Sequence, residues 1–108
     1  MRSKPIVSRW ETIDLEKITE MVSRKRVVGQ QQTIAQCYMK SGTYVPVHTQ
    51  ASEQMIYVLQ GAIRVVVDGT GFVVGEGEVV QLPAKLSRHI EVLEDTFHLE
   101  FSHLPEST

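Results

Sequence analysis

The fold prediction for this sequence rests mainly on the stretch GTYVPVHTQASEQMIYVLQG, residues 42–61. It contains two short runs rich in β-branched and aromatic residues, separated by the polar segment TQASE and closed by a glycine. Short apolar runs bounded by glycine or polar clusters are typical of β-strands. The same pattern of short apolar runs continues through most of the chain, which favours an all-β sandwich or barrel.

Alternation along these strands predicts which side chains share an interior. Gln54 has the same parity as Ile56 and Val58, so if the apolar pair points inward, Gln54 does too. His48 and Gln50 are two residues apart on the preceding strand and can face the same side. Polar side chains that converge on an apolar interior are how small-molecule and metal pockets are usually built.

The remaining elements follow from the same reading. Asp14 is a candidate cap for a short helical turn over LEKITEM, and Asp68-Gly69 between two apolar runs predicts a hairpin. Many short antiparallel strands avoid exposed edges by closing into a barrel. We expect strands at 20–29, 31–40, 46–50, 54–60, 61–68, 70–75, 78–83, 87–93 and 96–102.

Length and composition limit the classes of function. A chain of 108 residues with 42% hydrophobic content predicts one domain over residues 1–108. The net charge of -2 provides no field for nucleic acid or an anionic membrane, so neither partner is expected. No apolar run reaches about 18 residues, and we expect a soluble, cytoplasmic protein. Cys37 is the only cysteine, which excludes an internal disulfide and favours a role in core packing.

Two segments resemble the conserved motifs of the cupin superfamily. Residues 42–61 are similar to the first motif, in which H-x-H and a carboxylate or glutamine lie between two glycines. Residues 77–95, GEVVQLPAKLSRHIEVLED, are similar to the second motif, which supplies another histidine. The resemblance implies a single-domain cupin barrel, a double-stranded β-helix or jelly roll, here preceded by a short N-terminal helical turn.

The resemblance also implies a set of metal ligands, and this sequence changes two of them. The motif histidines correspond to His48 and to Gln50, and Gln54 stands where some cupins use glutamine. The second-motif histidine corresponds to Arg88, while His89 would face inward only if a bulge shifted the strand by one residue. The expected metal set is therefore His48, Gln50, Gln54 and a shifted His89, holding Zn, Ni, Mn or Fe.

Arg88 favours a different ligand. Neutral amide oxygens are weak donors, and a fixed positive charge at ~4–6 Å would repel a cation. The same guanidinium, together with Gln50, Gln54 and a histidine, would bind a carboxylate or phosphate well. The sequence therefore leaves two alternatives, a weakened metal site or a metal-free receptor in which Arg88 replaces the charge of the metal.

The last strand adds two candidate residues. In DTFHLEFSHL, residues 95–104, the aromatic and leucine positions alternate with His98 and Glu100. The two polar side chains either point into the interior, where Glu100 could neutralise Arg88 or help rebuild a metal site, or they lie on a solvated face.

The predicted function is binding of a polar, acidic small molecule inside the barrel. Pectin-degradation-type cupins, which convert unsaturated uronates, look most similar, and their acidic residue on the last strand corresponds to Glu100, although no arginine follows it in FSHLPEST. If the chain is an enzyme, His48 acts as ligand or general base and Glu100 moves a proton. Alternatives are a non-catalytic sensor and a structural dimer. A homodimer is expected because Met55, Tyr57 and Leu59 form a second apolar face.

Overall fold

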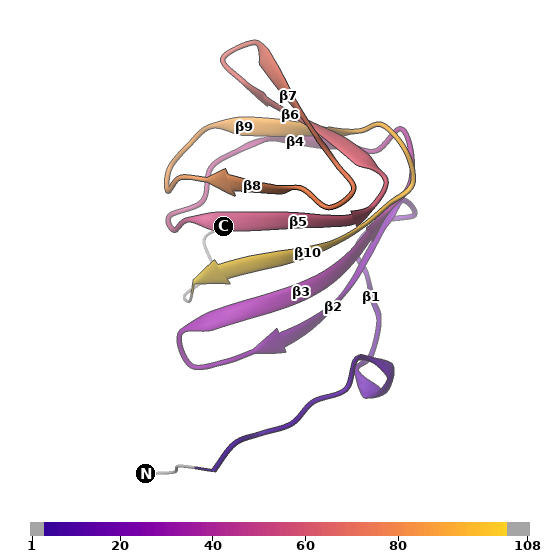
Figure 1. Cartoon of the computed structure of the whole chain (residues 1–108), viewed down its shortest axis with the longest axis vertical. Coiled ribbons are helices and arrows are strands. Elements are labelled where there is room, and N and C mark those ends of the chain that lie inside the picture. Colours follow the sequence, from indigo (N-terminus) through magenta and orange to yellow (C-terminus); the bar gives the residue numbers. More distant parts are fainter. Residues whose placement is uncertain (1–3, 104–108) are drawn as a thin grey trace.

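The computed structural model describes residues 4–103 and consists of two antiparallel β-sheets that face each other (Figure 1). The six-stranded sheet has the order β1-β2-β3-β10-β5-β8, and the four-stranded sheet has the order β4-β9-β6-β7. The elements are a 3-10 turn at Trp10–Thr12, β1 Glu16–Lys17, β2 Val22–Val28, β3 Gln32–Met39, β4 Tyr44–His48, β5 Gln54–Gln60, β6 Ala62–Val67, β7 Thr70–Gly75, β8 Val79–Leu82, β9 Arg88–Val92 and β10 Thr96–His103.

The all-β prediction is confirmed, and the expected strands from residue 20 onward agree with β2 to β10 within a few residues. The hairpin between β6 and β7 turns at Asp68 and Gly69, whose φ angles are 50° and 78°. Both angles lie in the left-handed region that Asp and Gly tolerate best. The turn chemistry of the sequence therefore fixes this hairpin locally.

The expected helical turn over LEKITEM is wrong in position. The helical turn lies earlier, at Trp10–Thr12, and the LEKITEM segment instead leads through β1 into β2. The amide of Ile18 donates to the carbonyl of Val22 over 2.9 Å, which closes a hairpin and excludes the helix. No helix among residues 4–103 is long and apolar enough to cross a membrane.

The core lies between the sheets and is made of the alternate residues of their inner faces. Strand β5 shows the pattern clearly, because Gln54, Ile56 and Val58 are buried while the residues between them are half-exposed. This is the period of two expected for a strand with one covered face. The buried apolar cluster consists of Met39, Ile56, Val58, Ile63, Val65, Val74, Leu82, Ile90 and Val92.

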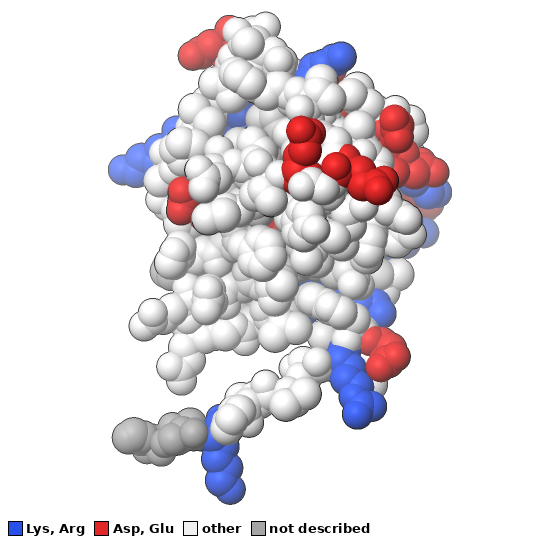
Figure 2. Space-filling view, viewed as in Figure 1, with Lys and Arg blue, Asp and Glu red and all other residues white. Residues whose placement is uncertain are grey.

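The outer face of the six-stranded sheet is also apolar. Aromatic and aliphatic side chains are neighbours across its strands, with Phe97 opposite Tyr38 and Leu99 opposite Tyr57. The Tyr38 and Phe97 rings lie 5.0 Å apart, and the Tyr38 residue is 55% exposed. Figure 2 shows few charged side chains over β10 and β3. An apolar sheet face of this kind marks a surface suited to contact with another protein.

Gly61 and Gly42 allow a test of how closely the chain packs at the end of β5. Both have positive φ, +96° and +88°, so alanine strains the backbone at either position. A Cβ at Gly61 would overlap the carbonyl oxygen of Asp95, whereas a Cβ at Gly42 would meet nothing within 4 Å. We expect Gly42→Ala to cost roughly 1–2 kcal/mol of unfolding free energy and Gly61→Ala roughly 2–5 kcal/mol. Urea unfolding measures both, and equal costs would contradict the packing at Gly61.

Candidate functional site

Strand β10 carries the polar side chains of the inner face. It lies between β3 and β5, and its register places His98 opposite Cys37 and Glu100 opposite Ala35 on one side and Ile56 on the other. Directly paired residues of antiparallel strands share a face. His98 and Glu100 therefore point inward, and the solvated reading of this pair is not what the structure shows.

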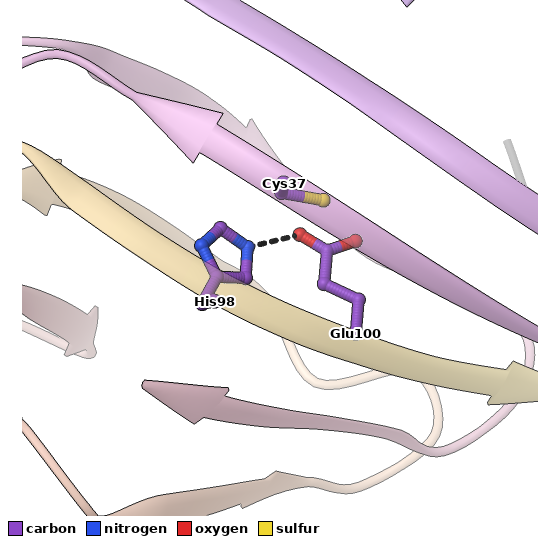
Figure 3. A group of neighbouring side chains, drawn as sticks. All are labelled: Cys37, His98 and Glu100. Carbon is purple, nitrogen blue, oxygen red and sulfur yellow. Dashed lines mark hydrogen bonds and ion pairs between the residues drawn. The ribbon is translucent and has the colours of Figure 1, made fainter. Parts of the chain in front are cut away.

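Glu100 links three side chains. Its Oε2 lies 2.8 Å from Nε2 of His98, and its Oε1 accepts a hydrogen bond of 3.3 Å from Nε2 of Gln54. Cys37, His98 and Glu100 point toward one another from β3 and β10 (Figure 3). His98 is fully buried, and its Nδ1 has no partner in the described part of the chain. Glu100 is 26% exposed, so the group lies at the edge of the core rather than deep inside it.

Arg88 joins this group from the opposite sheet. It begins β9, is only 1% exposed, and donates from Nη2 to Oε1 of Gln54 over 2.7 Å. Its Nη1 donates to the carbonyl oxygen of Leu86 over 3.1 Å, while its Nε, among the described residues, has no partner. The acceptors that contact this cation are therefore neutral. The amide of Gln54 bridges the two sheets, with its oxygen toward Arg88 and its nitrogen toward Glu100.

His48 and Gln50 lie at the border of this site. His48 pairs with Arg88 across β4 and β9 after a bulge, and it is half-buried. Its Nδ1 lies 2.9 Å from the carbonyl oxygen of Pro46, so Nδ1 carries the proton and Nε2 keeps a free lone pair in the neutral ring. Gln50 follows β4, is half-buried, and its backbone carbonyl accepts from the amide of Lys85 over 2.7 Å.

The structure does not bring His89 to the other expected ligands. The bulge that would turn it inward is absent from β9, where Arg88, Ile90 and Val92 are buried and the residues between them are not. The Nε2 of His89 lies 2.9 Å from Oε2 of Glu91, and its ring packs 5.0 Å from Tyr44 on the outer face. This corrects the expected ligand set, because the apolar phase of Ile90 and Val92 holds Arg88 inside instead.

Burial and charge set the protonation of the inner groups. Burial raises the pKa of Glu100, but the hydrogen bond and charge of His98, together with Arg24 and the Cys37 thiol, lower it by more, so the net pKa lies below its ordinary value. Burial, with the nearby Glu100 charge, raises the pKa of the Cys37 thiol strongly. Burial also lowers the pKa of Arg88, partly offset by Glu100, although an arginine stays protonated. At neutral pH the site holds a guanidinium, a carboxylate and a neutral thiol.

The residues at the expected metal position do not fit a divalent cation. Gln54 would have to offer the same oxygen that already accepts from Arg88 over 2.7 Å. A cation on that oxygen would lie within a few ångströms of a fixed positive charge, in surroundings that screen poorly. His48 alone supplies a strong neutral donor there. This part of the interior suits an anion better.

Sequence reasoning missed the neighbours that β2 and β3 contribute. Cys37 was expected only to pack in the core, yet it lies beside His98 and Glu100. Arg24 is on the inner face because it pairs with Cys37 across β2 and β3. Its Nε donates to Glu16 over 3.2 Å. The parity of Cys37 with the buried Ala35 could have indicated its inward direction, but nothing local indicates the pairing of β3 with β10.

Comparison with known proteins identifies the family. The cupin domain model matches residues 35–103, and this chain belongs to the cupin family. Comparison with curated proteins gives no match.

Solved structures with this fold have low sequence identity. An RmlC-like cupin from Shewanella frigidimarina is 19% identical, covers 95% of this chain and 94% of its own, and superposes with a TM-score of 0.83. KdgF from Halomonas sp. is 20% identical, with coverages of 86% and 87% and a TM-score of 0.78. Salicylate 1,2-dioxygenase from Pseudoaminobacter salicylatoxidans, in its adducts with gentisate, is 15% identical, with coverages of 83% and 27% and a TM-score of 0.75. These likenesses support the cupin fold.

The lowered pKa of Glu100 predicts an acid-dependent loss of stability. Its ionised form stabilises the fold fully above its ordinary pKa of 4.5, and this contribution is lost as pH falls through the lower native value. Glu100→Gln should cost roughly 1–3 kcal/mol of unfolding free energy at neutral pH, and the gap to the parent should narrow below about pH 4.5. Urea unfolding of protein freed of divalent metal on a chelating resin measures this gap.

Glu91→Gln is the matched control for this experiment. The pKa of Glu91 is also lowered, by hydrogen bonds from His89 and Arg64, but its carboxylate lies on the outer face in solvent. Its substitution should cost less and respond more to salt. A gap for Glu100→Gln that stays constant or widens on acidification would contradict the assignment of an ionised inner carboxylate.

Proposed function

We propose that this cupin binds an acidic small molecule between its sheets, with Arg88 supplying the positive charge that a metal ion supplies in other cupins. The observation that carries the proposal is the buried guanidinium of Arg88, whose contacts are two neutral oxygens and whose Nε lacks a partner in the described chain. A buried charge without a directly contacting counter-ion is expensive, and an anionic ligand would offset that cost.

The surrounding groups support an anion of modest size. Gln54 holds the guanidinium in place, and His48 lies opposite Arg88 with its Nε2 unengaged by the Pro46 contact. Guanidinium groups bind carboxylates through two parallel hydrogen bonds, which gives both strength and orientation. A sugar acid such as a uronate combines a carboxylate with hydroxyls that Gln50 and His48 could bind. The ligand class is therefore a small carboxylate with neighbouring hydroxyl groups.

Catalytic roles for His48 and Glu100 stay predictions. Glu100 is on the inner face, where its lowered pKa keeps it ionised at neutral pH but makes it a weak proton acceptor. Its oxygens are engaged by His98 and Gln54, while the Nδ1 of His48 contacts its own strand. Binding of an acid requires neither residue to transfer a proton, so the receptor role is the simpler reading of the geometry.

Heat protection by small carboxylates tests the proposed function. Acetate, malonate and galacturonate are added separately to protein freed of metal on a chelating resin, and unfolding is followed by differential scanning fluorimetry. A ligand that binds the native state raises the melting temperature, by roughly 4–8 °C for each kcal/mol of stabilisation. We expect at least one of these acids to protect the parent and none to protect Arg88→Met.

Arg64→Met is the matched control, because Arg64 pairs with Glu91 on the outer face over 2.9 Å. It should be protected as the parent is. Arg88→Lys keeps the charge but not the planar pair of donors, and should show weaker protection. Protection that persists in Arg88→Met, or an absence of protection by all three acids in the parent, would contradict the proposal.

A homodimer through the outer face of the six-stranded sheet is the proposed assembly. The apolar side chains of that face include Tyr38, Met55, Tyr57, Phe97, Leu99 and Phe101. Tyr57→Lys would place a charge among them and should shift the molar mass from two chains to one by light scattering. Tyr44→Lys, on the outer face of the other sheet, should remain dimeric. A monomeric parent, or a dimeric Tyr57→Lys variant, would remove this interface.

A further inference from the structure

The group formed by Cys37, His98 and Glu100 has the composition of a transition-metal site. A sulfur, a ring nitrogen and a carboxylate oxygen from these residues lie within 4.8 Å of one another. The three side chains come from adjacent strands and point toward a common position (Figure 3). None of them belongs to the ligand set that the family motifs imply, and the group lies on the six-stranded sheet rather than at the motif residues of β4 and β9.

The ligand atoms are close enough to reach a small tetrahedral ion after small side-chain movements. Zinc bonds of about 2.0–2.3 Å place tetrahedral ligand atoms roughly 3.3–3.8 Å apart. The contact of 2.8 Å between His98 Nε2 and Glu100 Oε2 is a hydrogen bond that an ion would replace, and the two atoms would then have to move apart by about half an ångström or slightly more. His98 and Cys37 are buried and held by the strand pairing, and the half-exposed Glu100 side chain can make this adjustment.

Charge and hydrogen bonding also agree with an ion at this position. A thiolate and a carboxylate together balance a divalent cation, and the imidazole adds a neutral donor. With the ion on Nε2, the ring proton of His98 would lie on Nδ1, which has no partner among residues 4–103. The opposing charges are Arg24, which acts on both Cys37 and Glu100 but is itself paired with Glu16, and Arg88, which interacts with Glu100 across Gln54.

We propose that Cys37, His98 and Glu100 bind one Zn²⁺ ion through sulfur, nitrogen and oxygen, with a fourth position for water or an added ligand. Binding replaces the S–H bond of Cys37 with a sulfur–metal bond and releases that proton to solvent. The ligand set includes neither Arg88 nor His48, so metal binding can be tested separately from the acid receptor.

Cobalt(II) tests the site because it replaces zinc and absorbs light. The reduced protein is titrated with Co²⁺ without oxygen, and thiolate-to-cobalt charge transfer is recorded in the near ultraviolet. The chain has one cysteine, so this band reports Cys37 alone. We expect the band in the parent, its displacement by Zn²⁺, and its full retention in His48→Ala, which removes the strong donor at the motif position.

Two variants complete the experiment. Cys37→Ser should lose the charge-transfer band, with circular dichroism reporting that it folds. Glu100→Gln keeps the thiol and should bind Co²⁺ at least about tenfold more weakly, since even partners that only support metal ligands change affinity by 10–100-fold. A parent that shows no charge transfer at millimolar Co²⁺, or a band lost in His48→Ala, would overturn the proposal, whatever the folding of Cys37→Ser.

Discussion

The register of β10 between β3 and β5 is the constraint on which the candidate site depends. It places His98 beside Cys37 and Glu100 beside Ile56 on the inner face, and leaves Phe97 and Leu99 on the outer one. Because side chains alternate along a strand, a shift of one residue would exchange the two sets, turning His98 and Glu100 outward and Phe97 and Leu99 toward the core. The burial of Ile56 and Val58 on β5 opposes that shift, so the packing of the core and the position of the polar group are fixed together.

The interior between the sheets holds the Arg88 cation from one sheet and the Glu100 anion from the other, and the two do not contact each other directly. Gln54 separates them, and its amide is oriented by both, accepting from Arg88 and donating to Glu100. A direct ion pair of Arg88 with Glu100 would neutralise both charges and leave little reason for a ligand to enter. The amide link leaves part of the guanidinium unsatisfied, and buried charges of this kind are weak evidence for stability alone. The proposed anionic ligand would supply the hydrogen bonds that this guanidinium lacks.

The sequence predicts what depends on local pattern and fails where distant strands meet. Alternation predicted that Gln54 shares the side of Ile56, and the apolar phase of β9 favoured Arg88 over His89 as the inward residue. The hairpin at Asp68-Gly69 follows from two residues. Neighbours of Cys37 could not be predicted, because β3 and β10 lie far apart in the chain and pair only in the folded sheet. The LEKITEM segment has helical spacing, but the ion pairs of Glu16 with Arg24 and Arg26 help hold it as a strand, which is a tertiary override of a weak local preference.

Glu100 contacts both proposed sites, and from its position we can predict how binding at one site would affect binding at the other. One of its oxygens faces Gln54 and the other faces His98, so an ion on the His98 side would leave the hydrogen bond to Gln54 in place. Such an ion would nevertheless neutralise the carboxylate, which acts on Arg88 across the amide. With that counter-charge reduced, the guanidinium would attract an external anion more strongly. Because such coupling is reciprocal, an acid bound at Arg88 would tighten the hold on the ion by the same factor. Positive cooperativity between metal and acid would therefore arise from one shared carboxylate, without any movement of the sheets.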